Sequence, residues 1–155
     1  MAVEIDLAQE GDTDWSAGIM ASSDPWVTLG RKYEQCFARV SHPEYRLLIA
    51  RVNGVRAGLV LLHPRGFASS PYVAILAVAP EFRSRGIGSA LLARAEIEFP
   101  EARFLFLLVS SFNSRAQTLY ERHGYKRVGE IPEYVIPGCS ELMFAKRLVK
   151  LAQSL

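Results

Sequence analysis

A short turn, Arg83-Ser84-Arg85-Gly86-Ile87-Gly88, lies between a continuous apolar run (72–78) and a helical pattern. An apolar run of this length is typical of a central strand, and a proline soon ends it. A helix N-terminus offers unpaired N–H groups and the positive end of its dipole, which together bind phosphate oxygens. The two glycines let the backbone approach a ligand closely, and the two arginines and Ser89 add charge and a hydroxyl. The turn therefore predicts a diphosphate site.

Two common phosphate motifs do not fit this turn. A dinucleotide-binding fingerprint needs glycine or alanine where Leu91 stands, and a P-loop needs a Lys-Ser/Thr pair after its second glycine. The alternatives left open are a different diphosphate site or a strand-to-helix turn that binds nothing.

The rest of the chain alternates strand and helix patterns. Asn53-Gly54 between apolar runs indicates a hairpin, and 63–66 is predicted as a loop. Strands are expected at 3–7, 45–52, 56–62, 72–78, 103–109, 125–131 and 141–148, and helices at 14–20, 27–40, 86–99 and 114–124. The fold class is therefore α/β, with a single mixed, mostly antiparallel central sheet flanked by helices.

Length and composition restrict the number of domains, the cellular compartment and the kinds of partner that we expect. The 155 residues fit one domain, 1–155, and no run reaches the roughly 18 apolar residues of a membrane span. The first ten residues lack a basic segment, so no secretory signal is expected. Cys36 and Cys139 stand alone, which favours free thiols in a reducing, cytoplasmic setting. No basic run interleaved with aromatics supports nucleic-acid binding.

Two blocks of the sequence resemble the GNAT superfamily of N-acetyltransferases. The first runs from Leu76 to Leu92 as LAVAPEFRSRGIGSALL and contains the R/Q-x-x-G-x-G/A core. The second has Asn113, then Ala116, then Leu119-Tyr120-Glu121-Arg122-His123-Gly124-Tyr125. This resemblance covers 72–128 and implies a GNAT-like fold, with acetyl-CoA or another acyl-CoA as the donor.

The resemblance also implies roles for individual residues. The backbone of Leu76, Ala77 and Val78 is expected to pair with the pantetheine amides, and Asn113 to bind the pantetheine arm. Tyr120 is expected to point at the thioester sulfur. The pyrophosphate cradle would consist of Arg83, Ser84, Arg85, Gly86, Ile87, Gly88 and Ser89.

Acylation of an amine by a thioester needs a proton for the departing thiolate. A phenol has a pKa near 10 and a thiol near 8.5, so Tyr120 stays protonated at neutral pH and can act as a general acid. The competing interpretation is a core tyrosine on an amphipathic helix. Asn113 has a competing interpretation too, as the N-cap of the helix that follows, although Ser114 can serve as that cap.

The proton acceptor is not assigned by the sequence. A primary amine with a pKa of about 10.4 is neutral in on the order of one molecule in a thousand at pH 7, so a base is needed. Some relatives place glutamate where Tyr72 and Leu108 stand. Glu133, Glu141 and His63 are candidates that the sequence favours as surface residues. The three histidines are dispersed, so no metal is expected.

Residues 1–40 are acidic, with seven acids and three bases, whereas 41–155 hold nine acids and fifteen bases. In the GNAT family this first section tends to cover the acceptor. Its acids, with Trp15 and Trp26, therefore suggest a lid suited to a cationic amine, although core packing explains the tryptophans equally simply.

The leading hypothesis is an acetyl-CoA-dependent N-acetyltransferase that acts on a primary amine, carried by a small molecule or a peptide. The alternative is a non-catalytic acyl-CoA-binding regulatory module, and a nucleotide-binding domain is opposed by the missing motifs. No nucleic acid or membrane partner is expected. The segment 131–138, with its two prolines, can shape an acceptor pocket or a homodimer contact, and the sequence does not choose between them.

Overall fold

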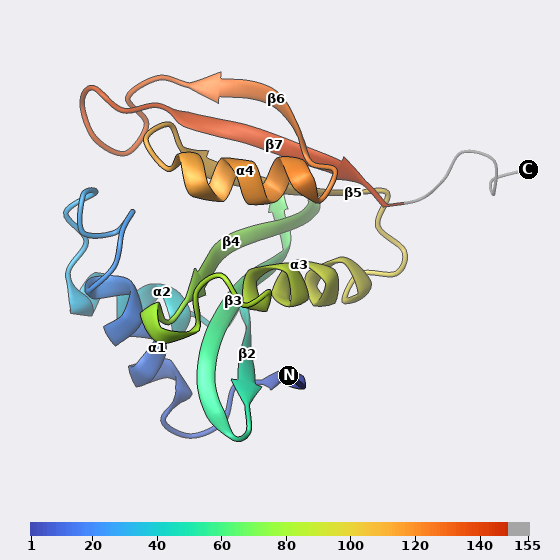
Figure 1. The fold of residues 1–155 in the computed structure, drawn as a ribbon. Helices are drawn as coiled ribbons and strands as arrows, with labels where there is room; N and C mark the ends of the chain where they lie inside the picture. The colour runs from blue at the N-terminus through green and yellow to red at the C-terminus, as the bar shows by residue number, and fades with distance from the viewer. Residues whose placement is uncertain (149–155) are drawn as a thin grey trace, which may run out of the picture.

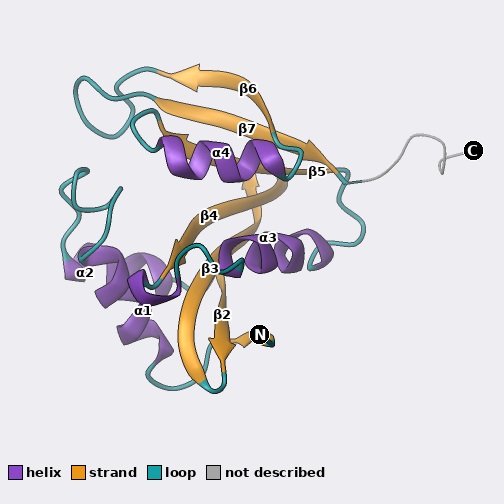
Figure 2. Cartoon of the chain, viewed as in Figure 1, coloured by secondary structure: helices purple, strands orange, loops and turns teal. Residues whose placement is uncertain are grey.

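A computed structural model describes residues 1–148 as one seven-stranded sheet with helices on both faces (Figures 1 and 2). The strands are β1 (Val3–Leu7), β2 (Arg46–Val52), β3 (Val55–Phe67), β4 (Ser70–Val78), β5 (Phe104–Ser110), β6 (Lys126–Ile131) and β7 (Glu141–Arg147). The helices are α1 (Asp12–Ala21), α2 (Tyr33–Val40), α3 (Ile87–Ile97) and α4 (Ser114–Arg122), with a 3₁₀ turn η1 (Pro80–Phe82). The predicted fold class and element order are confirmed.

Alternation along the central strands creates two separate cores. In β2, Leu48 and Ala50 face one side of the sheet, while Leu47 and Ile49 face the other. The first side packs against α3 and α4, and the second packs against α1 and α2. The strands in the middle of the sheet are therefore apolar on both faces, as their continuous apolar sequences predicted.

The sheet opens between β4 and β5. Its strand order is β1-β2-β3-β4-β5-β7-β6, and within residues 1–148 only the β4–β5 pair is parallel. These two strands pair only at Tyr72↔Phe106 and Val73↔Leu107 and then diverge (Figure 1). At the closed end Phe67 stacks on Phe106 with ring centroids 4.6 Å apart. Beyond Val73, one edge of β4 has no strand partner in the part of the chain that the structure describes.

Two predicted boundaries were wrong. Residues 63–66 belong to β3 rather than to a loop, because Gly66 lets the two strands approach closely; a Cβ there would lie 2.8 Å from Tyr72 Cβ. Residues 27–30 form turns, and 31–32 have no regular secondary structure, so neither part is helix. The Asp24 carboxylate accepts hydrogen bonds from the N–H and hydroxyl of Thr28, and α2 begins only after Lys32.

The Asn53-Gly54 hairpin is confirmed. Asn53 has a φ of 51° and Gly54 a φ of 78°, and two consecutive positive φ values are typical of the tight turns that suit twisted strands.

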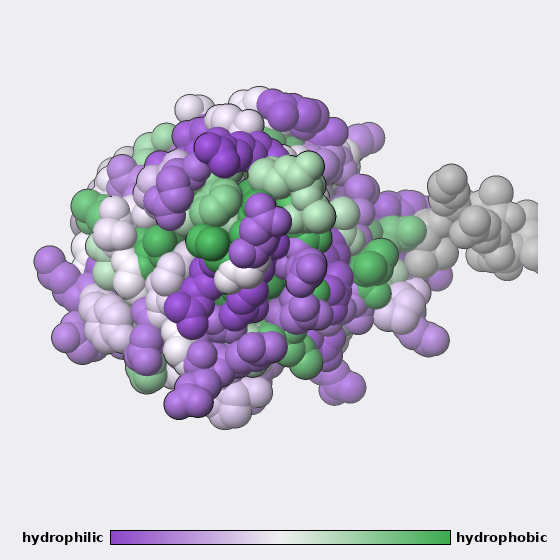
Figure 3. Space-filling model, turned by 60° about the horizontal axis from the view of Figure 1, so that its bottom comes forward, coloured by the Kyte–Doolittle hydropathy of each residue, from purple (hydrophilic) through white to green (hydrophobic). Residues whose placement is uncertain are grey.

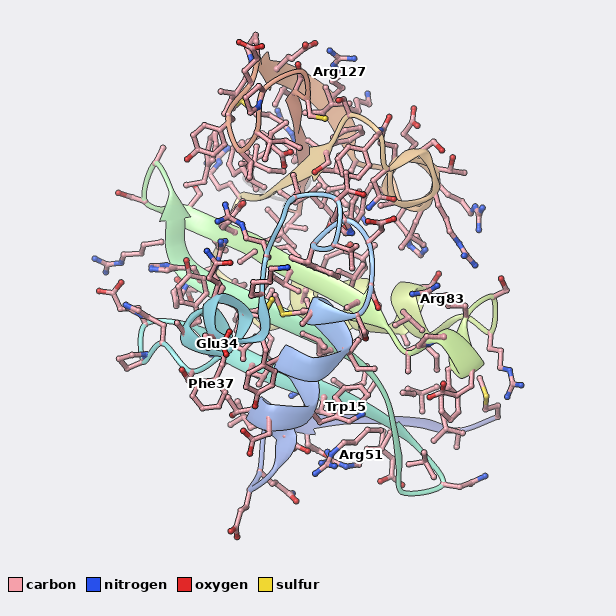
Figure 4. All side chains as sticks on the ribbon, turned by 90° about the vertical axis from the view of Figure 1, so that its left-hand side faces the viewer. Trp15, Glu34, Phe37, Arg51, Arg83 and Arg127 are labelled. Atoms are coloured by element: carbon pink, nitrogen blue, oxygen red, sulfur yellow. The ribbon has the colours of Figure 1, made fainter. Side chains whose placement is uncertain are left out.

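A buried carboxylate ties α1 to the β2–β3 hairpin. Asp12 is fully buried and accepts hydrogen bonds from Arg51 Nη2 at 2.6 Å and from Arg56 Nε at 2.7 Å. Figure 4 shows Arg51 beneath α1. Burial alone would raise the pKa of Asp12, but hydrogen bonds from the Gln9 N–H and from both arginines outweigh it and hold the pKa below its usual value.

The face of the molecule in Figure 3 is covered mainly by hydrophilic side chains, with smaller hydrophobic areas between them. Within residues 1–148, no helix combines the length and the apolar character that crossing a membrane requires.

Candidate active site

The predicted phosphate turn has the conformation of an anion site. Ser84 and Gly86 have positive φ values, 63° and 82°, and Gly86 is the N-cap of α3. No side chain caps this helix, and Ala90 is the first residue whose N–H reaches back to the Gly86 carbonyl, at 3.0 Å. The N–H groups of 87–89 therefore point out of the helix end and are available to an anion.

A cavity of about 610 Å³ opens at this turn, between α3, α4 and the free edge of β4. Its wall contains all but one of the residues predicted to bind the donor: Leu76, Ala77, Val78, Arg83, Ser84, Gly86, Ile87, Gly88, Ser89 and Asn113. Arg85 is not part of that wall; its guanidinium lies 5.7 Å from the centroid of the Phe82 ring. The Ser89 hydroxyl is hydrogen-bonded to His123 Nε2 at 2.8 Å.

The free edge of β4 supplies backbone groups to this cavity. β3 pairs with Leu76, Ala77 and Val78 on one side, and β5 has already diverged on the other. Because a strand's N–H and C=O groups alternate between its two edges, those on the open edge can bind an extended ligand with amide groups.

Two arginines that the sequence interpretation missed also line this cavity. Arg115 and Arg122 project from α4 on the same face as Leu119, and Arg115 Nη2 donates to Ser84 Oγ at 3.0 Å. Their spacing of seven residues places them on one helix face, which is a signal the sequence did contain. With Arg83 they add to the positive potential of the helix end.

Asn113 is the N-cap of α4. Its Oδ1 accepts a hydrogen bond from the Ala116 N–H at 3.2 Å, so the cap lies one residue before Ser114. This bond uses the carbonyl half of the side chain. The amide nitrogen, which is a donor only, has no acceptor within residues 1–148 and lies at the cavity wall.

Tyr120 lies on the inner face of α4 and is only 6% exposed. Its ring packs edge-on to Tyr125 at 6.0 Å and near Phe144 at 6.3 Å. Burial, with a smaller contribution from Tyr72, raises the pKa of Tyr120 above that of an ordinary phenol. The hydroxyl therefore keeps its proton at neutral pH, and it has no hydrogen-bond partner within residues 1–148.

A second cavity of about 350 Å³ adjoins the first. The two share one wall, which consists of Pro25, Trp26, Leu76, Asn113, Ala116 and Tyr120. Beyond that wall the second cavity is lined by α2 and the segment before it, by β4 and β5, and by the β6–β7 loop with the start of β7. The first cavity thus contains the anion site, and Tyr120 lies where the first cavity meets the second.

A family model described as the acetyltransferase (GNAT) family matches residues 11–125, which include the phosphate turn and Tyr120. The chain belongs to the GNAT family. As a GNAT acetyltransferase it is an acyltransferase, and acetyl transfer from acetyl-CoA is the activity of this family.

Solved structures of other GNAT proteins share the fold. The ribosomal-protein-S18-alanine N-acetyltransferase from Escherichia coli superposes with a TM-score of 0.77 at 20% identity, over 99% of each chain. An aminoglycoside 6'-N-acetyltransferase in complex with coenzyme A gives 0.76 at 15% identity, over 95% of this chain and 98% of that one. An Elizabethkingia anophelis GNAT acetyltransferase with acetyl-CoA bound gives 0.75 at 16%, over 94% and 97%.

The three residues considered as bases in this GNAT protein lie in different surroundings. Glu133 is exposed and accepts from the Gly138 N–H, and His63 lies 3.4 Å from Glu44 outside both cavities. Glu141, expected at the surface, is only 7% exposed and lines the second cavity. It is buried because it opens β7 directly opposite Ser110, whose hydroxyl donates to Oε2 at 2.7 Å.

The acids of residues 1–40 do not form the wall of the second cavity. From this section the cavity receives Arg31, Gln35 and Arg39 beside apolar residues, and among the described residues its single acid is Glu141. Figure 4 shows Glu34 and Phe37 on one side of the N-terminal helices and Arg83 on the other. Trp15 packs against the core, whereas Trp26 lines both cavities. Asp24 is the acid of this section that lines a cavity, and it lies in the wall of the first one, so the acidic lid stays a prediction.

Proposed function

We propose that this GNAT acetyltransferase, acting as one domain over 1–155, transfers the acetyl group of acetyl-CoA to a primary amine by direct attack. The observation that carries this proposal is the wall common to the two cavities, with the protonated Tyr120 at their junction. A donor in the larger cavity and an amine in the smaller one would meet at this hydroxyl.

The larger cavity suits acetyl-CoA in three respects. The N-terminus of α3 and the nearby arginines suit a pyrophosphate. The open edge of β4 and the Asn113 amide suit the amides of the pantetheine arm. An arm lying along β4 would bring its thioester towards the wall where Tyr120 stands.

The transfer step then needs two proton movements. The amine nitrogen attacks the thioester carbonyl carbon and loses one proton to a base, and the carbon–sulfur bond breaks. Tyr120 gives a proton to the departing sulfur, so the products are an N-acetylated amine and a free thiol. Neither movement requires a metal ion or a covalent acetyl-enzyme.

Thiol release from acetyl-CoA, measured with a panel of primary amines, tests this function, with mass spectrometry to identify the acetylated products. Calorimetry with acetyl-CoA alone measures donor binding separately. We expect both binding and amine-dependent thiol release. Binding without transfer to any amine would instead support a non-catalytic acyl-CoA-binding module.

A further inference from the structure

We infer that the second cavity accepts a small amine that also carries a carboxylate, such as a free amino acid, with Glu141 facing the amine and Arg31 and Arg39 facing the carboxylate. The inference rests on the proposed function, because it assumes that this cavity holds the acceptor. The acceptor would carry one positive and one negative group, and Glu141, Arg31 and Arg39 would bind them.

The charges in this cavity come from different elements of the fold. Glu141 comes from the start of β7, while both arginines come from α2 and the segment just before it. The two groups are more than one hundred residues apart in sequence, and the fold brings them around one cavity of about 350 Å³. A cavity of this size suits a compact acceptor, since ligand pockets usually start at about 300 Å³.

Glu141 is suited to an ammonium group. The Ser110 hydroxyl occupies Oε2, and Oε1 has no donor within residues 1–148. A buried carboxylate with one hydrogen bond is poorly compensated, and a cationic ligand supplies the missing partner. Burial raises the pKa of Glu141, opposed by the Ser110 bond, and a carboxylate with a raised pKa is a better proton acceptor from the bound ammonium.

The α2 face supplies the opposite charge. Arg39 lies four positions after Gln35 and three after Cys36, so it shares with them the helix face that lines the cavity. Neither Arg31 nor Arg39 forms an ion pair within residues 1–148. Guanidinium groups at a cavity rim can bind a carboxylate, with Gln35 as a further donor.

Tyr72 lines the same cavity and is influenced by charges of both signs. Burial raises the pKa of Tyr72 to about 12; the positive charge of Arg39 opposes this rise, and the negative charge of Glu141 adds to it. The Tyr72 hydroxyl is therefore within electrostatic reach of both residues. An acceptor with an ammonium and a carboxylate a few bonds apart matches such an arrangement.

The test compares amino acids with their primary amides, which keep the amine and the side chain but lack the carboxylate. We expect the full chain with acetyl-CoA to acetylate the acids more efficiently than the amides, in kcat/KM. In the double variant Arg31→Gln/Arg39→Gln this preference should fall about tenfold, as expected for losing a charge-assisted hydrogen bond at a partly exposed site. The matched control is Arg127→Gln, on β6 and outside both cavities, which should keep the preference.

Glu141→Gln should instead lower kcat for acids and amides alike, because both carry the amine. Acetylation of amides, or of other amines without a carboxylate, at least as efficiently as of acids overturns the inference and leaves the proposed function standing. An unchanged preference in the double variant also overturns it. If acetyl-CoA binds but no amine is acetylated, the proposed function falls and the inference falls with it.

Discussion

At the scale of single residues, the Tyr120 hydroxyl gives the clearest test of the chemistry. Tyr120→Phe removes the proposed proton donor, so we expect kcat to fall about 100-fold, within the usual range for general acids. KM for acetyl-CoA should change little. Because the hydroxyl has no protein partner within residues 1–148, its loss leaves no buried group unpaired, and the melting temperature should stay close to that of the wild type.

The neighbouring Tyr125 provides the matched control. Its ring packs against Tyr120, but its hydroxyl donates to Glu96 at 3.1 Å, away from both cavities. Tyr125→Phe should therefore lower the melting temperature and leave kcat unchanged. Equal turnover in Tyr120→Phe and the wild type would remove Tyr120 from the mechanism.

The sequence could identify those site residues whose function depends on local structure. The phosphate turn is one continuous segment, and Gly86 and Gly88 mark it directly. Glu141 was one of three candidate bases and was expected at the surface, because its burial depends on pairing with Ser110 across two strands that are distant in sequence. Arg31 was equally hidden, since its place in a cavity depends on how α2 packs.

At the scale of elements, the start of α3 depends on the backbone of Gly86. An alanine there would meet no atom within 4 Å, but the φ of +82° strains any residue with a Cβ. We expect Gly86→Ala to cost about 1 kcal/mol of stability and to weaken acetyl-CoA binding roughly tenfold, because the first N–H groups of α3 would turn away from the cavity. Denaturation and calorimetry measure the two effects.

Gly54→Ala is the control for this substitution. Gly54 has a φ of +78°, also has no atom within 4 Å of an added Cβ, and lies in the β2–β3 hairpin turn outside both cavities. Its stability loss should be similar, with acetyl-CoA binding intact. If both variants bind equally well, the α3 N-terminus does not hold the donor.

Elements with a strong local pattern were predicted well, and boundaries set by tertiary contacts were not. The strand at Val3–Leu7 and the helix at Ser114–Arg122 follow from alternation and from helix signals close by in the sequence. Helical periodicity predicted a helix over 27–40, but the helix begins only at Tyr33. Before it, the Asp24 side chain accepts from the Thr28 N–H and stabilises turns, and the Gln35 side chain accepts from the Lys32 N–H and caps the helix. The spacing of apolar residues does not show where side-chain hydrogen bonds to the backbone compete with helix formation.

At the scale of the whole molecule, Asp12 joins the N-terminal helices to the sheet. Asp12→Asn leaves Arg51 and Arg56 without their buried partner, so we expect a loss of about 3 kcal/mol at neutral pH, against little change for the exposed Glu10→Gln. Urea denaturation at several pH values measures this difference.

The difference in unfolding free energy between the wild type and Asp12→Asn should decrease as the pH falls. The folded state lowers the pKa of Asp12 below the value of 3.8 expected for the unfolded chain, so its stabilisation is fully present above that value. It is lost as the pH falls through the folded pKa. The wild type and Asp12→Asn should therefore converge in acid, and a deficit that stays constant below pH 3.8 would contradict this account.

The divergence of β4 and β5 has a consequence for what can enter the sheet. The strands are pinned together at Tyr72↔Phe106, and the Phe67–Phe106 stack reinforces this closed end. The opening is therefore a wedge whose width grows with distance from a fixed hinge. A ligand in such an opening is limited by its width, so we expect a slender, unbranched arm to fit along β4 where a broad one would not. The width of the opening is then set by the aromatic packing of Phe67 on Phe106, which lies outside both cavities.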